Sequence, residues 1–309
     1  MIKIYYSTAH SNRITKIKKI REGAWLNLVN TDHNDLNKIA KLTKLGIIDL
    51  QDSMDINELP RIERHKDSLI VFVRTPKDQS TVSDFLYTQS MTFVITSRYF
   101  ITISPAENPA IKSIIKDGLT SATTQRARLL ITLLLKIAQL YTVRIKEINN
   151  AVISRKKHID SIKDSDIGAL VKYEDILNQY IAALIPMRNV FENIMTGTYL
   201  DMYKDDEALF DDMINNIHQS VDICQVNLKS IRSLRESYQI VFTNRLNKVI
   251  QFLTAFTIIM TIPTIIASLY GMNVKLPLAE SPFAFSYILL ISAFIISLFL
   301  YIFYKKKWL

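Results

Sequence analysis

Two long uncharged apolar stretches lie close together near the C-terminus of this 309-residue chain. Val249–Leu269 and Phe283–Tyr304 contain no Asp, Glu, Lys or Arg. Each is about as long as the ~20 residues that a helix needs to cross a ~30 Å hydrocarbon core. A pair of buried core helices is a poor alternative, because little protein remains at this end of the chain to bury them. The sequence therefore predicts two membrane spans, at about 249–269 and 283–304, with a loop over 270–282.

The charges that flank the spans predict their orientation. Arg245 and Lys248 precede the first span, Lys305–Lys307 follow the second, and the loop carries only Lys275 and Glu280. Because basic residues favour the cytoplasmic side, we expect both termini to be cytoplasmic and the loop to be extracellular. The first residues lack a signal-peptide pattern, which agrees with this orientation. The expected location is the cell membrane, with a multi-pass topology.

Residues 1–125 mix strand and helix signals and predict a cytoplasmic α/β domain. The segment Asp35–Leu45 has a helical pattern that Gly46 would stop. Ser97 and Arg98 have the position of a hairpin turn between two strands. The predicted strands are the β-rich runs Ser68–Arg74, Thr92–Thr96 and Tyr99–Ile103.

Residues 126–248 are expected to form long helices, including a stalk that continues into the first span. The helical patterns are Arg126–Lys163, Asp166–Thr196 with a possible bend at Pro186, and a third that begins near Asp205. The third would be about 65 residues long, on the order of 100 Å at 1.5 Å per residue. The fold class is therefore an α+β membrane protein, with the α/β domain at 1–125, the helices at 126–248 and the transmembrane domain at 249–309.

The third helical pattern contains an apolar seam that needs other helices to cover it. Its members follow alternating three- and four-residue steps: Ile214, Ile217, Val221, Cys224, Leu228 and Ile231. After an interruption at Arg235, Tyr238 and Phe242 resume the seam. The partners would come from the same chain or from symmetry-related copies. Cys224 is the single cysteine, so the sequence excludes an internal disulfide and predicts a buried structural thiol.

A polar stripe continues the same rhythm through the first span. Its hydroxyl residues are Thr254, Thr257, Thr261, Thr264 and Ser268, and Asn247 and Ile250 extend the face toward the stalk. Hydroxyls in membrane helices often bond back to the carbonyl four residues earlier or tighten helix contacts. Five in unbroken register favour a face that meets water or another copy of the chain. One helix cannot enclose a pore, so the stripe predicts a homo-oligomer.

The tetrad Tyr270-Gly271-Met272-Asn273 after the first span resembles the Gly-Met-Asn signature of the CorA family of divalent-cation transporters. The C-terminal Lys305–Leu309 is also similar to that family. The resemblance implies a funnel-shaped homopentamer, with an α/β cytoplasmic domain and a stalk helix that becomes the pore lining. Such proteins move magnesium, and often cobalt or nickel, down the electrochemical gradient. Magnesium would be the transported and regulatory ion, and no catalytic cofactor is expected.

The resemblance also assigns pore residues. Gly271, Met272 and Asn273 would form the selectivity filter, where Gly271 permits a tight turn and Asn273 offers neutral amide oxygens to the hydrated ion. Ile250 and Leu253 would be a hydrophobic constriction. The implied pore lining as a whole is Asn247, Ile250, Leu253, Thr261, Thr264 and Ser268. Two departures from the family are a Pro263 shifted by one residue and Ser268 in place of a glycine.

The acidic segment Asp201–Asp212 suggests regulation. Such a run is commonly a solvated helix start, where acids also favour the positive end of the helix. In the family, however, inhibitory magnesium binds between neighbouring cytoplasmic domains through an aspartate that corresponds to Asp212. The resemblance makes Asp67, from the α/β domain, its tentative partner.

Other functions have less support. A zinc transporter of the ZntB-like branch would select soft metals, but no His or Cys lies in the spans or their loop. A membrane-anchored sensor without transport would need neither the hydroxyl stripe nor the signature. No nucleophile–base arrangement or phosphate-binding glycine loop supports an enzyme. The net charge of +9 is spread along the chain without a nucleic-acid module, so nucleic acid is not an expected partner.

Overall fold

The structure is a computed structural model that describes residues 2–8, 14–65, 67–77, 86–117, 122–156, 164–197, 199, 204–274, 276–277 and 281–308. The chain divides into two compact units, Met1–Ser233 and Leu234–Leu309. The long helix α6 (Lys204–Tyr270) contributes to both of them.

A mixed sheet organises the first unit. Its strand order is β2-β1-β3-β7-β6-β5-β4, and all neighbours are antiparallel except the parallel pair β3–β7. The strands of this described part are β1 (Ile2–Tyr6), β2 (Thr15–Ile17), β3 (Trp25–Val29), β4 (Arg61–His65), β5 (Ser68–Pro76), β6 (Thr88–Ile95) and β7 (Phe100–Ser104). The predicted strands at 68–74, 92–96 and 99–103 are confirmed as parts of β5, β6 and β7. The predicted hairpin between β6 and β7 is also confirmed, because the Thr96 amide donates to the Tyr99 carbonyl at 3.0 Å.

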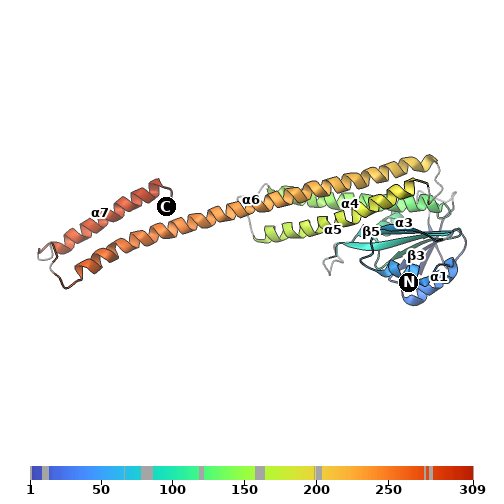
Figure 1. The fold of residues 1–309 in the computed structure, drawn as a ribbon, viewed down its shortest axis with the longest axis horizontal. Helices are drawn as coiled ribbons and strands as arrows, with labels where there is room; N and C mark the ends of the chain where they lie inside the picture. Colours follow the sequence, from blue (N-terminus) through green and yellow to red (C-terminus); the bar gives the residue numbers. More distant parts are fainter. Residues whose placement is uncertain are drawn as a thin grey trace. The chain divides into compact units, whose positions relative to one another are not determined.

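Helices cover both faces of this sheet (Figure 1). On one face, α1 (His33–Thr43) and α2 (Ile47–Gln51) bury Leu36, Ile39 and Leu50 against alternate side chains of the strands. On the other face lie α4 (Arg126–Lys156) and α5 (Asp164–Met195), with α3 (Pro109–Asp117) packed beside α4. Period-two alternation in the strands supplies an apolar set to each face. The predicted α/β fold of the N-terminal region is confirmed.

The end of α1 corrects one expectation from the sequence. Gly46 does not stop this helix, because Lys44 already adopts a left-handed φ of 60° at its C-cap. Gly46 instead precedes α2, and its backbone amide donates a hydrogen bond to the Asp49 carboxylate at 3.2 Å. A non-glycine residue thus takes the conformation usually left to glycine, and the glycine begins the next helix.

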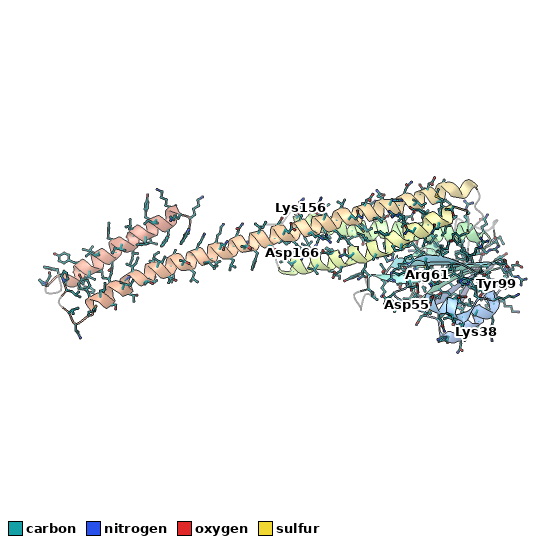
Figure 2. All side chains as sticks on the ribbon, in the orientation of Figure 1. Lys38, Asp55, Arg61, Tyr99, Lys156 and Asp166 are labelled. Atoms are coloured by element: carbon teal, nitrogen blue, oxygen red, sulfur yellow. The ribbon has the colours of Figure 1, made fainter. Side chains whose placement is uncertain are left out.

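A charged cluster lies around Arg61 of the edge strand β4; Figure 2 labels Arg61. The Arg61 guanidinium donates to Asp52 at 2.8 Å, to Glu63 at 2.7 Å and to Glu58, and it lies over the Phe72 ring. Asp52 belongs to the short 3-10 helix η1 (Asp52–Met54). These bonds hold η1 and the following turn at the edge, where exposed backbone groups would otherwise invite another strand.

The lower part of α6 packs on the helices of its own chain. Ser220 and Thr142 of α4 share a hydrogen bond of 2.9 Å between their hydroxyls. Arg232 reaches Glu174 of α5 at 3.4 Å, and Ile217, Cys224 and Ile231 of the predicted seam are fully buried. Burial also raises the pKa of the Cys224 thiol to about 12, so the predicted buried structural thiol is confirmed. The seam members within this unit therefore have intramolecular partners, while Phe242, in the second unit, is 67% exposed.

The second unit holds the two predicted spans. The upper part of α6 ends at Tyr270, and α7 (Ala284–Lys305) follows the loop. Both helices contain a stretch long and apolar enough to cross a membrane. After α7 the chain folds back, because the Trp308 amide donates to the Phe303 carbonyl at 2.9 Å and the two rings stack.

Candidate functional site

The Gly-Met-Asn segment forms an exposed turn where α6 ends. The Gly271 amide still donates to the Ala267 carbonyl at 3.0 Å, and the Met272 amide donates to the Leu269 carbonyl at 3.3 Å. From Gly271 to Val274 every residue is exposed within the chain. The helix therefore presents Met272 and Asn273 just beyond its last turn, at the end of the first span.

Gly271 is suited to this turn by a close approach and not by an unusual φ angle. Its φ lies outside the left-handed region, unlike those of Gly23 and Gly197. A Cβ at Gly271 would lie 3.3 Å from the Ala267 carbonyl oxygen and 3.6 Å from that of Ser268. A side chain here would press on the carbonyls that end the helix, so the expected conformational reason for this glycine is corrected to a steric one.

Tyr270 ties the loop back to the end of the helix, a role that sequence reasoning missed. Its hydroxyl donates to the Pro277 carbonyl at 3.3 Å. The bond spans the Gly-Met-Asn turn and so limits its freedom. A tyrosine directly before a turn and a proline seven residues later were the available signals. Lys275 and Glu280 of the same loop lie outside the described residues.

Three members of the hydroxyl stripe show the back-bonding that the sequence offered as one alternative. Thr257, Thr261 and Thr264 donate to the carbonyls four residues earlier, at 2.8, 2.7 and 3.1 Å. The back-bonding therefore exists. It uses the hydroxyl hydrogen and leaves oxygen lone pairs to face outward. A face of acceptors is suited to the water molecules around a cation, whose hydrogens point away from the metal.

The stripe lies away from the face of α6 that the rest of its unit shields. The shielded or half-shielded positions are Gln251, Ala255, Ile258, Ile259, Ile262, Pro263, Ile266 and Tyr270, with Ala255 fully buried. At 3.6 residues per turn, the centre of this face lies about 150° around the helix from the centre of the hydroxyl stripe. Since α7 is the other helix of this unit in the described part of the chain, the shielded face is the one that α7 covers. The stripe is left uncovered within one chain.

Two apolar residues continue the stripe toward the stalk. Ile250 is 51% exposed and Leu253 is 60% exposed. Both fall within about 60° of the centre of the hydroxyl stripe, and Asn247 lies one turn before them on the same side. The predicted pore residues of the first span therefore share one face, which runs from amide through apolar to hydroxyl side chains.

The two proposed regulatory aspartates are not joined within one chain. Asp212 is exposed on α6, where its own carbonyl accepts from the Asn216 amide at 2.7 Å. Asp67 is exposed in the turn between β4 and β5. Within the described ranges, no group of three or more His, Cys, Asp or Glu residues is placed to hold a metal ion. Asp211 of the Asp201–Asp212 segment is also exposed, and the side chains of its acids before residue 208 lie outside the described ones.

The second unit thus supplies two candidate membrane helices, and α6 carries a continuous polar face through one of them. The chain belongs to the family of CorA-like Mg2+ transporter proteins, whose model matches residues 21–306. Members of this family transport ions and are not enzymes, so divalent cation transport is the function class of this chain.

Individual relatives agree with this assignment. The chain is 23% identical over 273 residues to the cobalt/magnesium transport protein CorA of Methanocaldococcus jannaschii, covering 84% of this chain and 83% of the relative. The complete structure of the CorA magnesium transporter from that organism superposes with a TM-score of 0.84 at 21% identity, covering 100% of this chain and 99% of the other. The predicted fold of a two-span CorA-like membrane protein is thereby confirmed.

The ZntB-like alternative gains only a likeness of fold. The ZntB cytoplasmic domain from Vibrio parahaemolyticus gives a TM-score of 0.64 at 9% identity, covering 79% of this chain and 98% of that domain. Such a likeness reflects the shared α/β architecture. The family match extends across both units and does not favour the ZntB-like branch.

Proposed function

We propose that this protein conducts magnesium into the cell, down its electrochemical gradient, through a pore formed by several copies of the chain, in a pentamer. The observation that carries the proposal is the uncovered polar face of α6, on the side away from α7. One such face cannot enclose water. Copies arranged around an axis would place the acceptors of all their stripes along one aqueous path.

Selection would occur at the turn after the span. Magnesium prefers octahedral oxygen coordination and gives up its water reluctantly. A ring of Asn273 amides would therefore accept hydrogen bonds from the hydrated ion and recognise its size. Neutral amides bind a divalent ion more weakly than carboxylates would, and conduction requires release as well as binding. Tyr270 and Gly271 would position this ring by fixing the turn.

Gating would occur at the apolar band of Ile250 and Leu253. A narrow ring of such side chains excludes water and so closes the pore without an obstructing lid. Magnesium bound between Asp212 and acids of a neighbouring copy, Asp67 among them, would cancel their repulsion and favour the closed arrangement. Loss of that ion would let the copies shift and would widen the band. The termini and this regulatory site would face the cytoplasm.

Ion flux into liposomes that contain only the purified protein tests the proposal. Magnesium uptake should occur without ATP and should rise steeply with an inside-negative potential, because each charge crossing 100 mV is worth ~2.3 kcal/mol, or ~4.6 for Mg2+. Asn273→Ala should reduce uptake at least about tenfold with assembly intact. Asn244→Ala, on the same helix before the span, is the matched control and should leave flux unchanged.

Flux that ignores the membrane potential would contradict the channel mechanism. Normal flux through a correctly assembled Asn273→Ala protein would remove that residue from selection. Zinc uptake faster than magnesium uptake under the same gradient would favour the ZntB-like alternative.

A further inference from the structure

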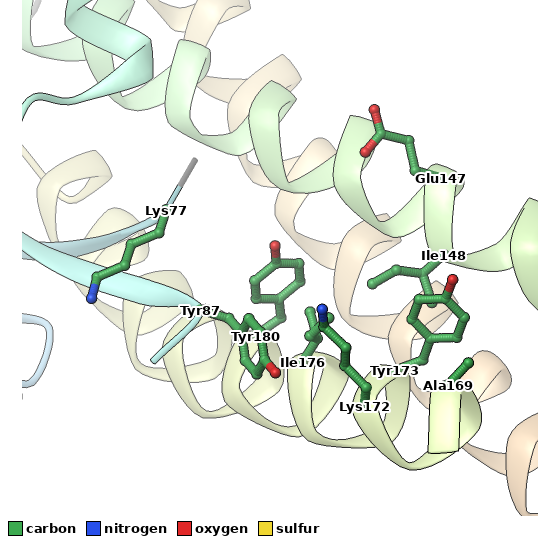
Figure 3. Close-up of a pocket in the computed structure, with 9 residues that line it drawn as sticks. All are labelled: Lys77, Tyr87, Glu147, Ile148, Ala169, Lys172, Tyr173, Ile176 and Tyr180. Atoms are coloured by element: carbon green, nitrogen blue, oxygen red, sulfur yellow. The ribbon is translucent and has the colours of Figure 1, made fainter. Parts of the chain in front are cut away.

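The first unit contains a cavity of about 440 Å³ whose lining includes none of the predicted pore residues (Figure 3). It opens between the ends of β5 and β6 on one side and the helices α4 and α5 on the other. Its lining is Lys77, Tyr87, Glu147, Ile148, Ala169, Lys172, Tyr173, Ile176 and Tyr180. A cavity of this volume is in the range that small organic ligands occupy in proteins.

Three tyrosine rings form the walls, and their positions are held by other contacts. Tyr180 packs edge-to-face on Tyr141 with ring centroids 5.1 Å apart. The Tyr87 backbone amide donates to the Gln179 side-chain oxygen at 2.9 Å, and the Arg155 guanidinium lies 5.4 Å from the Tyr173 ring centroid. The walls are therefore preformed, which lowers the entropy cost of binding a ligand.

The tyrosine hydroxyls are the unusual feature of this cavity. Tyr180 is 4% exposed and Tyr87 is 8% exposed, but neither hydroxyl is among the fully buried unpartnered atoms of the described residues, so water in the cavity can stand in for a protein hydrogen-bond partner. Among the residues that the structure describes, the hydroxyls of Tyr87, Tyr173 and Tyr180 have none. Burial raises the pKa of Tyr180 and of Tyr87, so both hydroxyls stay protonated at neutral pH and remain donors.

The charges of the lining favour an anion. The lining contains two lysines, Lys77 and Lys172, and one carboxylate, that of Glu147. This carboxylate already forms an ion pair with Arg144 at 2.9 Å. No ion pair holds Lys172 within the described parts of the chain. In Figure 3 the ammonium of Lys172 lies in the direction of the Tyr87 and Tyr180 rings, whereas that of Lys77 points away from them. Lys172 is thus the cation best placed for an anionic group.

We propose that this cavity binds a nucleoside monophosphate. The planar base would lie against the tyrosine rings and the apolar side chains of Ile148 and Ile176, since aromatic side chains stack on bases without regard to sequence. The phosphate would accept hydrogen bonds from Lys172 and the tyrosine hydroxyls. We infer a phosphate and not a carboxylate because these groups offer more hydrogen-bond donors than the two oxygens of a carboxylate can accept. The volume accommodates one base, one ribose and one phosphate, and two lysines cannot neutralise a longer polyphosphate.

Equilibrium dialysis of the purified full-length protein in detergent against radiolabelled AMP tests this proposal. AMP should bind saturably, at one site per chain, below about 1 mM, which is a modest affinity for a site with one well-placed cation. Adenosine alone and inorganic phosphate alone should each bind at least about tenfold more weakly, because each supplies only half of the contacts.

Substitutions locate the site. Lys172→Ala and Tyr173→Ala should each weaken AMP binding about tenfold, and Tyr173→Phe should retain much of it by keeping the ring. The control Lys146→Ala removes an exposed lysine on α4 outside the lining and should change nothing. The proposal would be overturned if inorganic phosphate bound as tightly as AMP, or if AMP binding did not saturate. Equal effects of Lys172→Ala and Lys146→Ala would overturn it as well. The readout is binding alone, so its outcome is independent of the transport experiment.

Discussion

The side-chain nitrogen of Asn227 is buried in α6 and has no hydrogen-bond partner among the described residues. The residue is only 2% exposed, so solvent does not replace the missing partner. A buried donor left in this state costs about 1–3 kcal/mol. Its position beside Leu228 of the apolar seam makes it a site where the wild-type sequence is not optimal for stability.

Asn227→Ala is therefore expected to stabilise the protein. The control Asn178→Ala, at an exposed position of α5, gains helix propensity only. The free energy of unfolding should rise by about 1 kcal/mol more in the Asn227 variant than in this control, because the substitution also removes the unpaired amide. This figure already subtracts the cost of the small cavity that the substitution leaves. Thermal unfolding of both variants in the same detergent measures the difference. A larger gain in the Asn178 variant would show that the Asn227 amide is satisfied in solution.

Substitutions of Thr261 can separate the effect of its hydroxyl oxygen on flux from its effect on the helix. Thr261→Val keeps the shape of the side chain and removes its oxygen, so magnesium flux should fall several-fold while the helix remains intact. Thr261→Ser restores the oxygen and should keep most of the flux. Thr243→Val is the matched control, because Thr243 also bonds back to the carbonyl four residues earlier, at 2.8 Å, but lies before the span. Unchanged flux in Thr261→Val would exclude this oxygen from the pore.

At the scale of elements, α6 changes its partners along its length. Up to Ser233 its apolar seam packs on α4 and α5, and within the span its shielded face is the one that α7 covers. The face that carries Ile250, Leu253 and the hydroxyls meets neither. A helix with one covered face and one uncovered polar face is typical of a pore lining, because lipid does not satisfy polar side chains.

Ile250→Ala tests the apolar band of that face. A smaller side chain at every copy should widen the constriction and admit water, so basal magnesium flux should rise several-fold when internal magnesium is high. Ile259→Ala makes the same change on the shielded face and should alter stability without opening the pore. Stopped-flow uptake into liposomes preloaded with magnesium compares the two variants. Equal flux in both would place the constriction elsewhere.

At the scale of the whole molecule, the proposed regulation would use acids from more than one copy. Asp212→Asn removes one charge from each chain, so internal magnesium should inhibit flux several-fold less strongly. Magnesium should also protect the protein less against limited proteolysis, while the maximal flux stays unchanged. Asp222→Asn, at an exposed site further along the same helix, is the control. If both variants keep wild-type inhibition, Asp212 is only part of a solvated helix surface and the sensor lies elsewhere.

The periodicity and charge of the sequence determined much of this protein. They predicted the strands, the long helices and the two spans, because local propensity and the length of an apolar run depend only on neighbouring residues. The hydroxyl stripe was also readable, since residues three and four apart share a helix face. The resemblance at Tyr270–Asn273 added the family, which the match over residues 21–306 confirmed.

Only the tertiary structure decided which face of each helix is covered and by what. It assigned the seam of α6 to α4 and α5, turned the shielded face of the first span to α7, and brought Tyr270 to the Pro277 carbonyl. It also assembled the tyrosine-walled cavity from residues about 100 positions apart, such as Lys77 and Tyr180. Helical periodicity specifies that a face must be buried, but not its partner, because that choice depends on contacts between segments far apart in the chain.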